Sequence, residues 1–120
     1  MRTMRSIGML IRMTLLQKRY AERQRERLVL FDLTRKELRE CLHETLPGRR
    51  VILFGSLTKR GVFNAASDID LALFDEPVGK NIFGLTAEID ERMRRPVDIV
   101  LLGKTRLKEK ILREGEVWMT

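Results

Sequence analysis

The sequence has a single cysteine and a single histidine among its 120 residues. One cysteine cannot form an intramolecular disulfide, so the composition fits a reducing, cytoplasmic environment. Cys41 shares helical spacing with Leu38 and Leu42, which predicts a position in the core and not a nucleophile. His43 lies between those positions, and we expect it on the surface. Neither residue is therefore expected to take part in a reaction.

Long apolar runs and aromatic residues are also scarce. No apolar run approaches the roughly 18–20 residues of a membrane-spanning helix, and the apolar patch before Arg12 is too short for a secretory signal. We therefore expect no membrane association. Aromatic residues make up 6% of the chain and form no cluster that could stack nucleic-acid bases. With 43% hydrophobic and 34% charged residues, the chain is typical of one folded domain with a modest core.

Acidic residues are missing from the first 21 positions of a chain whose net charge is +7. Residues 1–33 hold eight Lys and Arg against three acids, and the other 87 residues hold sixteen against fourteen. The basic character thus belongs to the N-terminal segment, which argues against nucleic-acid binding by the remainder. The row of Arg19, Arg23 and Arg27 is typical of a solvated helix face, and an arm that meets an acidic partner or RNA is the alternative.

The N-terminal segment predicts one long helix that begins near residue 8. Its narrow apolar stripe consists of Met9, Met13, Leu16 and Tyr20, spaced by four, three and four positions. Such a stripe must be buried against its own domain, a second copy or another protein. We favour a homo-oligomer or a protein partner, because a domain of this size offers limited core to cover so long a helix.

A helix start or restart is predicted at Thr34, because Thr34-x-x-Glu37 has the form of a capping box. Pro47-Gly48 ends that helix. We therefore divide the chain into an N-terminal helical extension, residues 1–33, and a domain, residues 34–120.

Short apolar runs predict three strands, at residues 50–54, 68–74 and 95–102, with a helix over residues 80–94 between the last two. A strand–helix–strand unit makes its two strands parallel neighbours. We therefore expect Asp98, near the start of the third strand, to lie beside Asp68 and Asp70. A short final helix and an apolar anchor at Val117-Trp118 complete the expected fold.

The chemistry is concentrated in the first two strands and the segment between them. The first strand ends at Gly55-Ser56, and an eleven-residue connector leads to Asp68-Ile69-Asp70. A Gly-Ser turn after a strand exposes backbone N–H groups and a hydroxyl, which is a common phosphate cradle. Two carboxylates on one strand face repel each other, and a divalent cation relieves that repulsion. The alternatives are an ordinary turn and a strand start exposed to water.

This order of features resembles the signature of the DNA polymerase β-like nucleotidyltransferase superfamily: strand, Gly-Ser, basic connector, Asp-x-Asp, then a later strand with a third acid. The chain is most similar to the minimal nucleotidyltransferases (MNT), many of which pair with HEPN-domain proteins as toxin–antitoxin modules. The resemblance covers roughly residue 34 to the C-terminus. It implies an α/β (α+β) fold, with a small mixed β-sheet flanked by helices and the long N-terminal helix added.

The resemblance also implies a site with three metal-binding, catalytic carboxylates and four nucleotide-binding residues, namely Asp68, Asp70 and Asp98, and Gly55, Ser56, Lys59 and Arg60. The carboxylates would hold two Mg²⁺ ions, and Asp98 would also help to deprotonate an acceptor hydroxyl. ATP is the expected nucleotide, and the acceptor is expected on a HEPN-type protein partner. Alternatives are an antitoxin that binds a nucleotide but acts by contact, and an RNA-binding module. The third carboxylate favours the enzyme.

Overall fold

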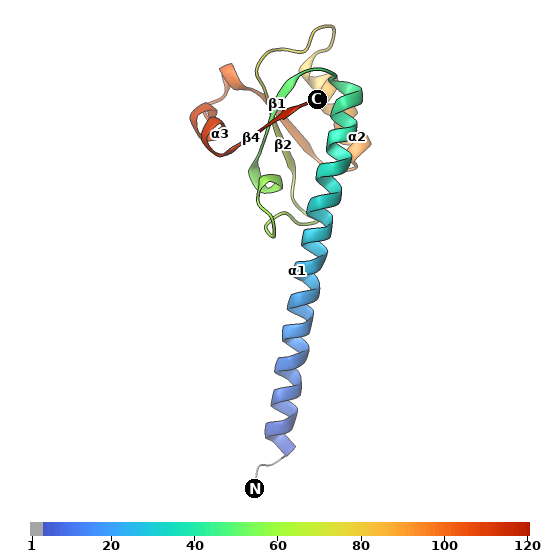
Figure 1. The fold of residues 1–120 in the computed structure, drawn as a ribbon, viewed down its shortest axis with the longest axis vertical. Helices are drawn as coiled ribbons and strands as arrows, with labels where there is room; N and C mark the ends of the chain where they lie inside the picture. The colour runs from blue at the N-terminus through green and yellow to red at the C-terminus, as the bar shows by residue number, and fades with distance from the viewer. Residues whose placement is uncertain (1–3) are drawn as a thin grey trace.

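The computed structural model describes the backbone of residues 4–120 and the side chains of residues 12 and 14–120. The elements follow the chain in the order α1 (Met4–Thr45), β1 (Arg50–Phe54), the 3-10 turn η1 (Gly55–Thr58), β2 (Ile69–Leu73), α2 (Ile82–Met93), β3 (Val97–Leu101), the 3-10 turn η2 (Leu102–Lys104), α3 (Lys108–Glu114) and β4 (Glu116–Met119). The predicted fold class, a small mixed sheet with helices and a long N-terminal helix, is confirmed (Figure 1).

The four strands form one sheet in the order β3-β2-β1-β4. Strands β2 and β3 are parallel, as the strand–helix–strand unit predicted, and β1 is antiparallel to both β2 and β4. The predicted apolar anchor at the C-terminus is strand β4, in which Trp118 is buried at 3% exposure, whereas Val117 is 59% exposed and anchors nothing. Because β1 runs opposite to β2 and β3, the end of β1 meets the starts of those two strands at one edge of the sheet.

Alternation along the strands divides the apolar side chains between the two faces of the sheet. One face carries Val51, Leu53, Leu71 and Ile99, and packs against α1 and α2 in the larger core cluster. The opposite face carries Ile52 and Ala72, and packs against Ile111 of α3 in a smaller cluster. Since α3 has only seven residues, it covers part of that second face and leaves the rest accessible.

Helix α1 is continuous from Met4 to Thr45, so the predicted start or restart at Thr34 is wrong. A capping box acts only where the chain enters a helix from a non-helical conformation. Here Leu30 and Phe31, one turn earlier, already pack on the core, and Thr34 itself is buried. Packing of that face keeps the backbone helical through Thr34, and no glycine or proline lies between residues 9 and 45. The boundary between residues 33 and 34 stays a prediction.

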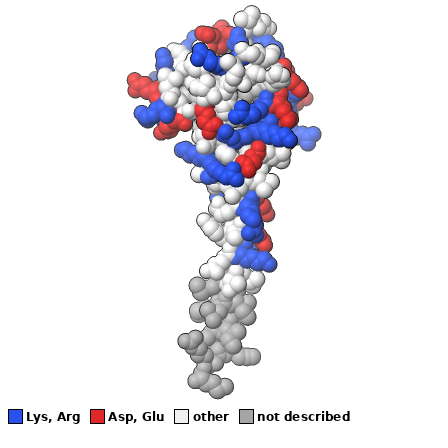
Figure 2. All heavy atoms as spheres, viewed as in Figure 1, with Lys and Arg blue, Asp and Glu red and all other residues white. Residues whose placement is uncertain are grey.

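The N-terminal part of α1 extends far beyond the sheet and its other helices, and the whole molecule measures 76 × 28 × 21 Å (Figure 1). Leu16 and Tyr20, two members of the predicted stripe, are 61% and 66% exposed. The side chains of the other two members, Met9 and Met13, lie outside the described residues. Basic side chains run along this arm in Figure 2. No described helix is long and apolar enough to cross a membrane.

Truncations separate the arm from the folded part of α1. Deletion of residues 1–20 is expected to leave a folded protein, because Leu16 and Tyr20 contribute nothing to the core. We also expect an altered oligomeric state, because the deletion removes the apolar stripe that a second copy or a partner would cover. Deletion of residues 1–33 also removes the buried Phe31 side chain, and we expect a loss of about 3–5 kcal/mol in the free energy of unfolding. Denaturant unfolding and light scattering of both truncated proteins test this. Equal stability of the two would contradict the structure.

Candidate active site

A cavity of about 320 Å³ lies at the sheet edge where β1 ends and β2 and β3 begin. It is on the face of the sheet that α3 covers in part. Its walls come from the end of β1, the turn η1, the middle of β2 and β3, and α3, and consist of Phe54, Gly55, Thr58, Lys59, Asp70, Asp98, Val100, Leu107, Lys110, Ile111 and Glu114. Four of the seven residues predicted from the sequence therefore line one cavity.

Two of the three predicted carboxylates, Asp70 and Asp98, are direct neighbours. They are register partners across the parallel pair β2 and β3. Both alternate with buried apolar residues, so both side chains leave the sheet on the side of α3. Asp98 takes part in none of the ion pairs found in the described part of the chain. The predicted proximity of Asp98 to the β2 acids is thus confirmed at Asp70.

The third carboxylate, Asp68, is exposed and precedes the first residue of β2. It does not line the cavity. The connector before it is held in place, since the Arg95 guanidinium donates to the carbonyls of Asn64 and Ser67 and stacks on the ring of Phe63. Asp68 therefore lies at the end of an ordered segment, directly before β2. There it is close enough for its charge to affect Asp70.

Mutual repulsion and burial both act on Asp70. Burial raises the pKa of its carboxyl, and the charges of Asp98 and then Asp68 raise that pKa further. A carboxylate that is partly desolvated and faces another carboxylate is less stable than the same group in water. A bound cation would remove this cost, and carboxylate oxygens are ligands that Mg²⁺ prefers. The donor chemistry therefore fits Mg²⁺, although no three Asp, Glu, His or Cys side chains among the described residues are gathered into a metal site.

Gly55 has a structural reason to be glycine. Its φ angle is +75°, and a Cβ atom built on it would lie 2.3 Å from Oδ2 of Asp70. Any side chain at this position would strain the backbone and collide with the carboxylate. The sequence predicted a phosphate cradle at the Gly-Ser turn. In the structure the close approach is between the Gly55 backbone and Asp70, which brings the turn η1 against the carboxylate pair.

The predicted cations separate into two environments. Lys59 is exposed and lines the cavity, and its predicted contact with phosphate stays a prediction. Arg60 points the other way, to an ion pair of 2.8 Å with Asp32 of α1. Ser56 is absent from the cavity wall, and its carbonyl accepts the backbone N–H of Lys59. The roles assigned to Ser56 and Arg60 stay predictions.

The sequence did not identify the wall formed by α3. Lys110, Ile111 and Glu114 line the cavity from this helix, and Leu107, directly before the helix, adds to the same wall. Their spacing of three and four residues, which puts them on one helix side, was visible in the sequence. Only the sheet topology reveals that this side faces Asp70 and Asp98. Lys110 thus adds a second cation to the cavity, next to an apolar wall formed with Phe54 and Val100.

Comparisons with known proteins bear on the family and the fold of the chain. The family model described as polymerase beta, nucleotidyltransferase matches residues 36–120. The fold is similar to a crystal structure described as a toxin–antitoxin with AMP-PNP (TM-score 0.55, 24% identity, covering 71% of this chain and 73% of that chain). It is also similar to a crystal structure of the toxin–antitoxin MntA-HepT (TM-score 0.52, 23% identity, covering 74% and 73%). No curated protein matches the chain.

The repulsion at Asp70 predicts a stabilising substitution. In metal-free buffer at neutral pH, Asp70→Asn should raise the melting temperature by a few degrees, on the order of 1 kcal/mol, because it removes a partly buried charge that faces Asp98. The matched control is Asp75→Asn, just beyond the other end of β2, where the side chain is exposed. Thermal unfolding followed by circular dichroism measures both. A lower melting temperature for Asp70→Asn would show that its carboxylate stabilises the fold.

Proposed function

Because the chain belongs to the polymerase beta nucleotidyltransferase family, whose model matches residues 36–120, we propose that it moves AMP from ATP to an acceptor hydroxyl. The observation that carries this proposal is the juxtaposition of Asp70 and Asp98 in a cavity that also contains Gly55, Lys59 and Lys110. Paired carboxylates beside lysines and a glycine turn provide what nucleotidyl transfer needs, which is positioning and charge neutralisation more than covalent chemistry.

In the proposed reaction the acceptor oxygen attacks the α-phosphorus of ATP. A new O–P bond forms, the bond from the α-phosphorus to the bridging oxygen of the β-phosphate breaks, and pyrophosphate leaves. Asp98 takes the proton of the hydroxyl and later releases it to solvent. Asp98 suits this role because it is exposed, lines the cavity and has no cationic partner within the described chain.

The residues of the turn and of α3 would bind the triphosphate. Gly55, Lys59 and Lys110 all contribute to the cavity wall, and the two lysines add positive charge there. The apolar wall of Phe54, Val100 and Leu107 suits the uncharged part of a nucleotide. We propose that Asp70 and Asp98, with Asp68 beside them, hold Mg²⁺, which would neutralise charge on the phosphates. The use of ATP is supported by the similar fold of the toxin–antitoxin with AMP-PNP.

We further propose that the acceptor belongs to a HEPN-type protein partner, so that the chain acts as an MNT-type antitoxin. This is supported by the two similar structures, both of which are toxin–antitoxin proteins. The arm of α1, residues 12–27, is a candidate contact surface, because Leu15, Leu16 and Tyr20 are half or more exposed. It would be buried against that partner or against a second copy of this chain.

Asp98→Asn tests the proposed reaction. We expect this variant to keep most of its affinity for MgATP, since Asp70, Lys59 and Lys110 remain, and to lose roughly 10²–10⁴-fold in the rate of transfer, as is typical when a general base is removed. The assay is single-turnover transfer of AMP from α-³²P-labelled ATP to a co-purified partner, with a melting curve on the same sample.

A folded Asp98→Asn protein that transfers AMP at the rate of the unmutated chain would overturn the proposed role of Asp98. If the unmutated chain binds MgATP but transfers no AMP, the protein is a nucleotide-binding antitoxin that acts by contact.

Lys110→Met tests the wall contributed by α3. We expect about a fivefold rise in the dissociation constant for MgATP, because one charge contact at a partly solvated site is lost. The matched control is Lys108→Met, which removes an exposed lysine of the same helix outside the cavity. Isothermal titration calorimetry measures both. Equal affinities for the two variants would place the triphosphate away from α3.

A further inference from the structure

The turn η1 is the part of the cavity wall that depends most on contacts from elsewhere in the fold. It consists of the four residues Gly55–Thr58 directly after β1, and three residues of this region, Gly55, Thr58 and Lys59, face the cavity. Within the turn, the Thr58 hydroxyl donates to the Gly55 carbonyl at 2.7 Å and the Lys59 N–H to the Ser56 carbonyl at 3.0 Å. Short 3-10 turns have poor hydrogen-bond geometry and little stability of their own. The turn therefore depends on contacts from outside.

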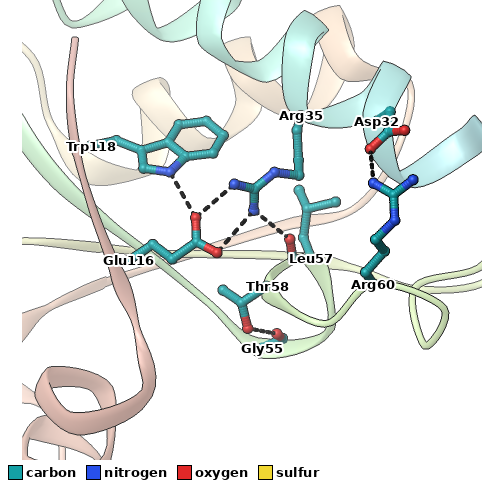
Figure 3. Close-up of polar contacts among 8 residues, drawn as sticks. All are labelled: Asp32, Arg35, Gly55, Leu57, Thr58, Arg60, Glu116 and Trp118. Atoms are coloured by element: carbon teal, nitrogen blue, oxygen red, sulfur yellow. Dashed lines mark hydrogen bonds and ion pairs between the residues drawn. The ribbon is translucent and has the colours of Figure 1, made fainter. Parts of the chain in front are cut away.

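Two contacts anchor the turn, and both pass through Leu57. Its side chain is fully buried in the larger core cluster. Its carbonyl oxygen, which the turn leaves without an internal donor, accepts a hydrogen bond of 2.9 Å from Nη1 of Arg35 in α1 (Figure 3). The side-chain anchor fixes one point of the turn, and the Arg35 bond fixes the orientation of its peptide planes.

Arg35 is itself held rigidly. Its Nη1 and Nη2 atoms donate to both carboxylate oxygens of Glu116, at 3.2 and 2.7 Å, and the Trp118 indole donates to the same carboxylate at 3.2 Å (Figure 3). The guanidinium also lies over the rings of Phe31 and Trp118, at 5.0 and 5.1 Å from their centroids. The hydrogen bonds from Arg35 lower the pKa of Glu116, so this carboxylate stays ionised to lower pH than a free glutamate. The planar guanidinium of Arg35 is thus fixed by its hydrogen bonds and by the two rings, so it is a preorganised donor to the Leu57 carbonyl.

We propose that Arg35 is a positioning residue for nucleotide binding: through the Leu57 carbonyl it holds the turn η1 in the shape that places Gly55 and Lys59 in the cavity. This inference rests on the proposed function. Arg35 immediately precedes the residues that the family model matches. A simpler role for Arg35 is a strut that joins α1 to β4 through Glu116.

Two variants separate these roles. Arg35→Met keeps the apolar stem of the side chain but removes both the bond to Leu57 and the ion pair. Glu116→Gln removes the charge of the ion pair and leaves Arg35 free to donate to Leu57. If Arg35 only joins α1 to β4, both variants should lose stability. If Arg35 positions the turn η1, only Arg35→Met should disturb the turn. Should Arg35→Met fail to fold, Arg35→Lys replaces it, since a lysine ammonium cannot span Leu57 and Glu116 with a planar fork.

The measurements are amide hydrogen exchange at Lys59 and Val62, whose N–H groups bond within this segment, and the affinity for MgATP, each beside a melting curve. In Arg35→Met we expect exchange at these amides to be about tenfold faster and the dissociation constant for MgATP to be about tenfold higher. In Glu116→Gln both quantities should stay within about twofold of the unmutated protein.

Equal exchange rates in the two variants would overturn the proposal and leave Arg35 as a strut. Faster exchange in Arg35→Met with unchanged affinity for MgATP would also overturn it, because the turn would then not control binding. If the unmutated protein binds no MgATP, the proposed function fails, and the exchange rates alone decide whether Arg35 orders the turn.

Discussion

The pairing of Asp70 with Asp98 across parallel strands is the constraint on which the rest of the site depends. Two carboxylates side by side on a partly covered sheet face cost stability, as the raised pKa of Asp70 indicates. A fold built for stability alone would place apolar residues there and lengthen α3 over them. The uncovered face, the short helix and the unpaired acids are consistent with a site that a cationic ligand completes.

The surrounding strands and helices place Asp70 and Asp98 side by side and bring the turn η1 against them. The parallel β2–β3 unit, with α2 as its crossover, brings the two acids into register. The antiparallel β1 delivers its turn to the same edge, and Gly55 allows that turn to approach Asp70 without a collision. Arg35 then links the turn to α1 and β4. The cavity is therefore lined by segments from β1 to α3, and its geometry depends on long-range contacts, including those of Arg35.

Local patterns were sufficient to predict β1, β2, β3 and the parallel pair, and the family resemblance added four of the residues that line the cavity, Gly55, Lys59, Asp70 and Asp98. Alternation and short apolar runs located β1 to β3, and the crossover rule placed Asp98 beside Asp70. The continuity of α1 through Thr34 was not predictable from a capping motif, because burial of Phe31 on the core decides it. Lys110 and Arg35 were missed for the same reason: their roles depend on which distant elements they face, and no local periodicity records that.

The most direct test of the account is to locate the metal and the nucleotide together. Crystals grown with AMP-PNP and Mn²⁺ allow the ion to be found by its anomalous scattering. The account predicts an anomalous peak within coordination distance of Asp70 and Asp98, about 2.0–2.3 Å from their oxygens, with the triphosphate against Gly55 and Lys59. A nucleotide bound elsewhere, or a metal that leaves both carboxylates free, would contradict it.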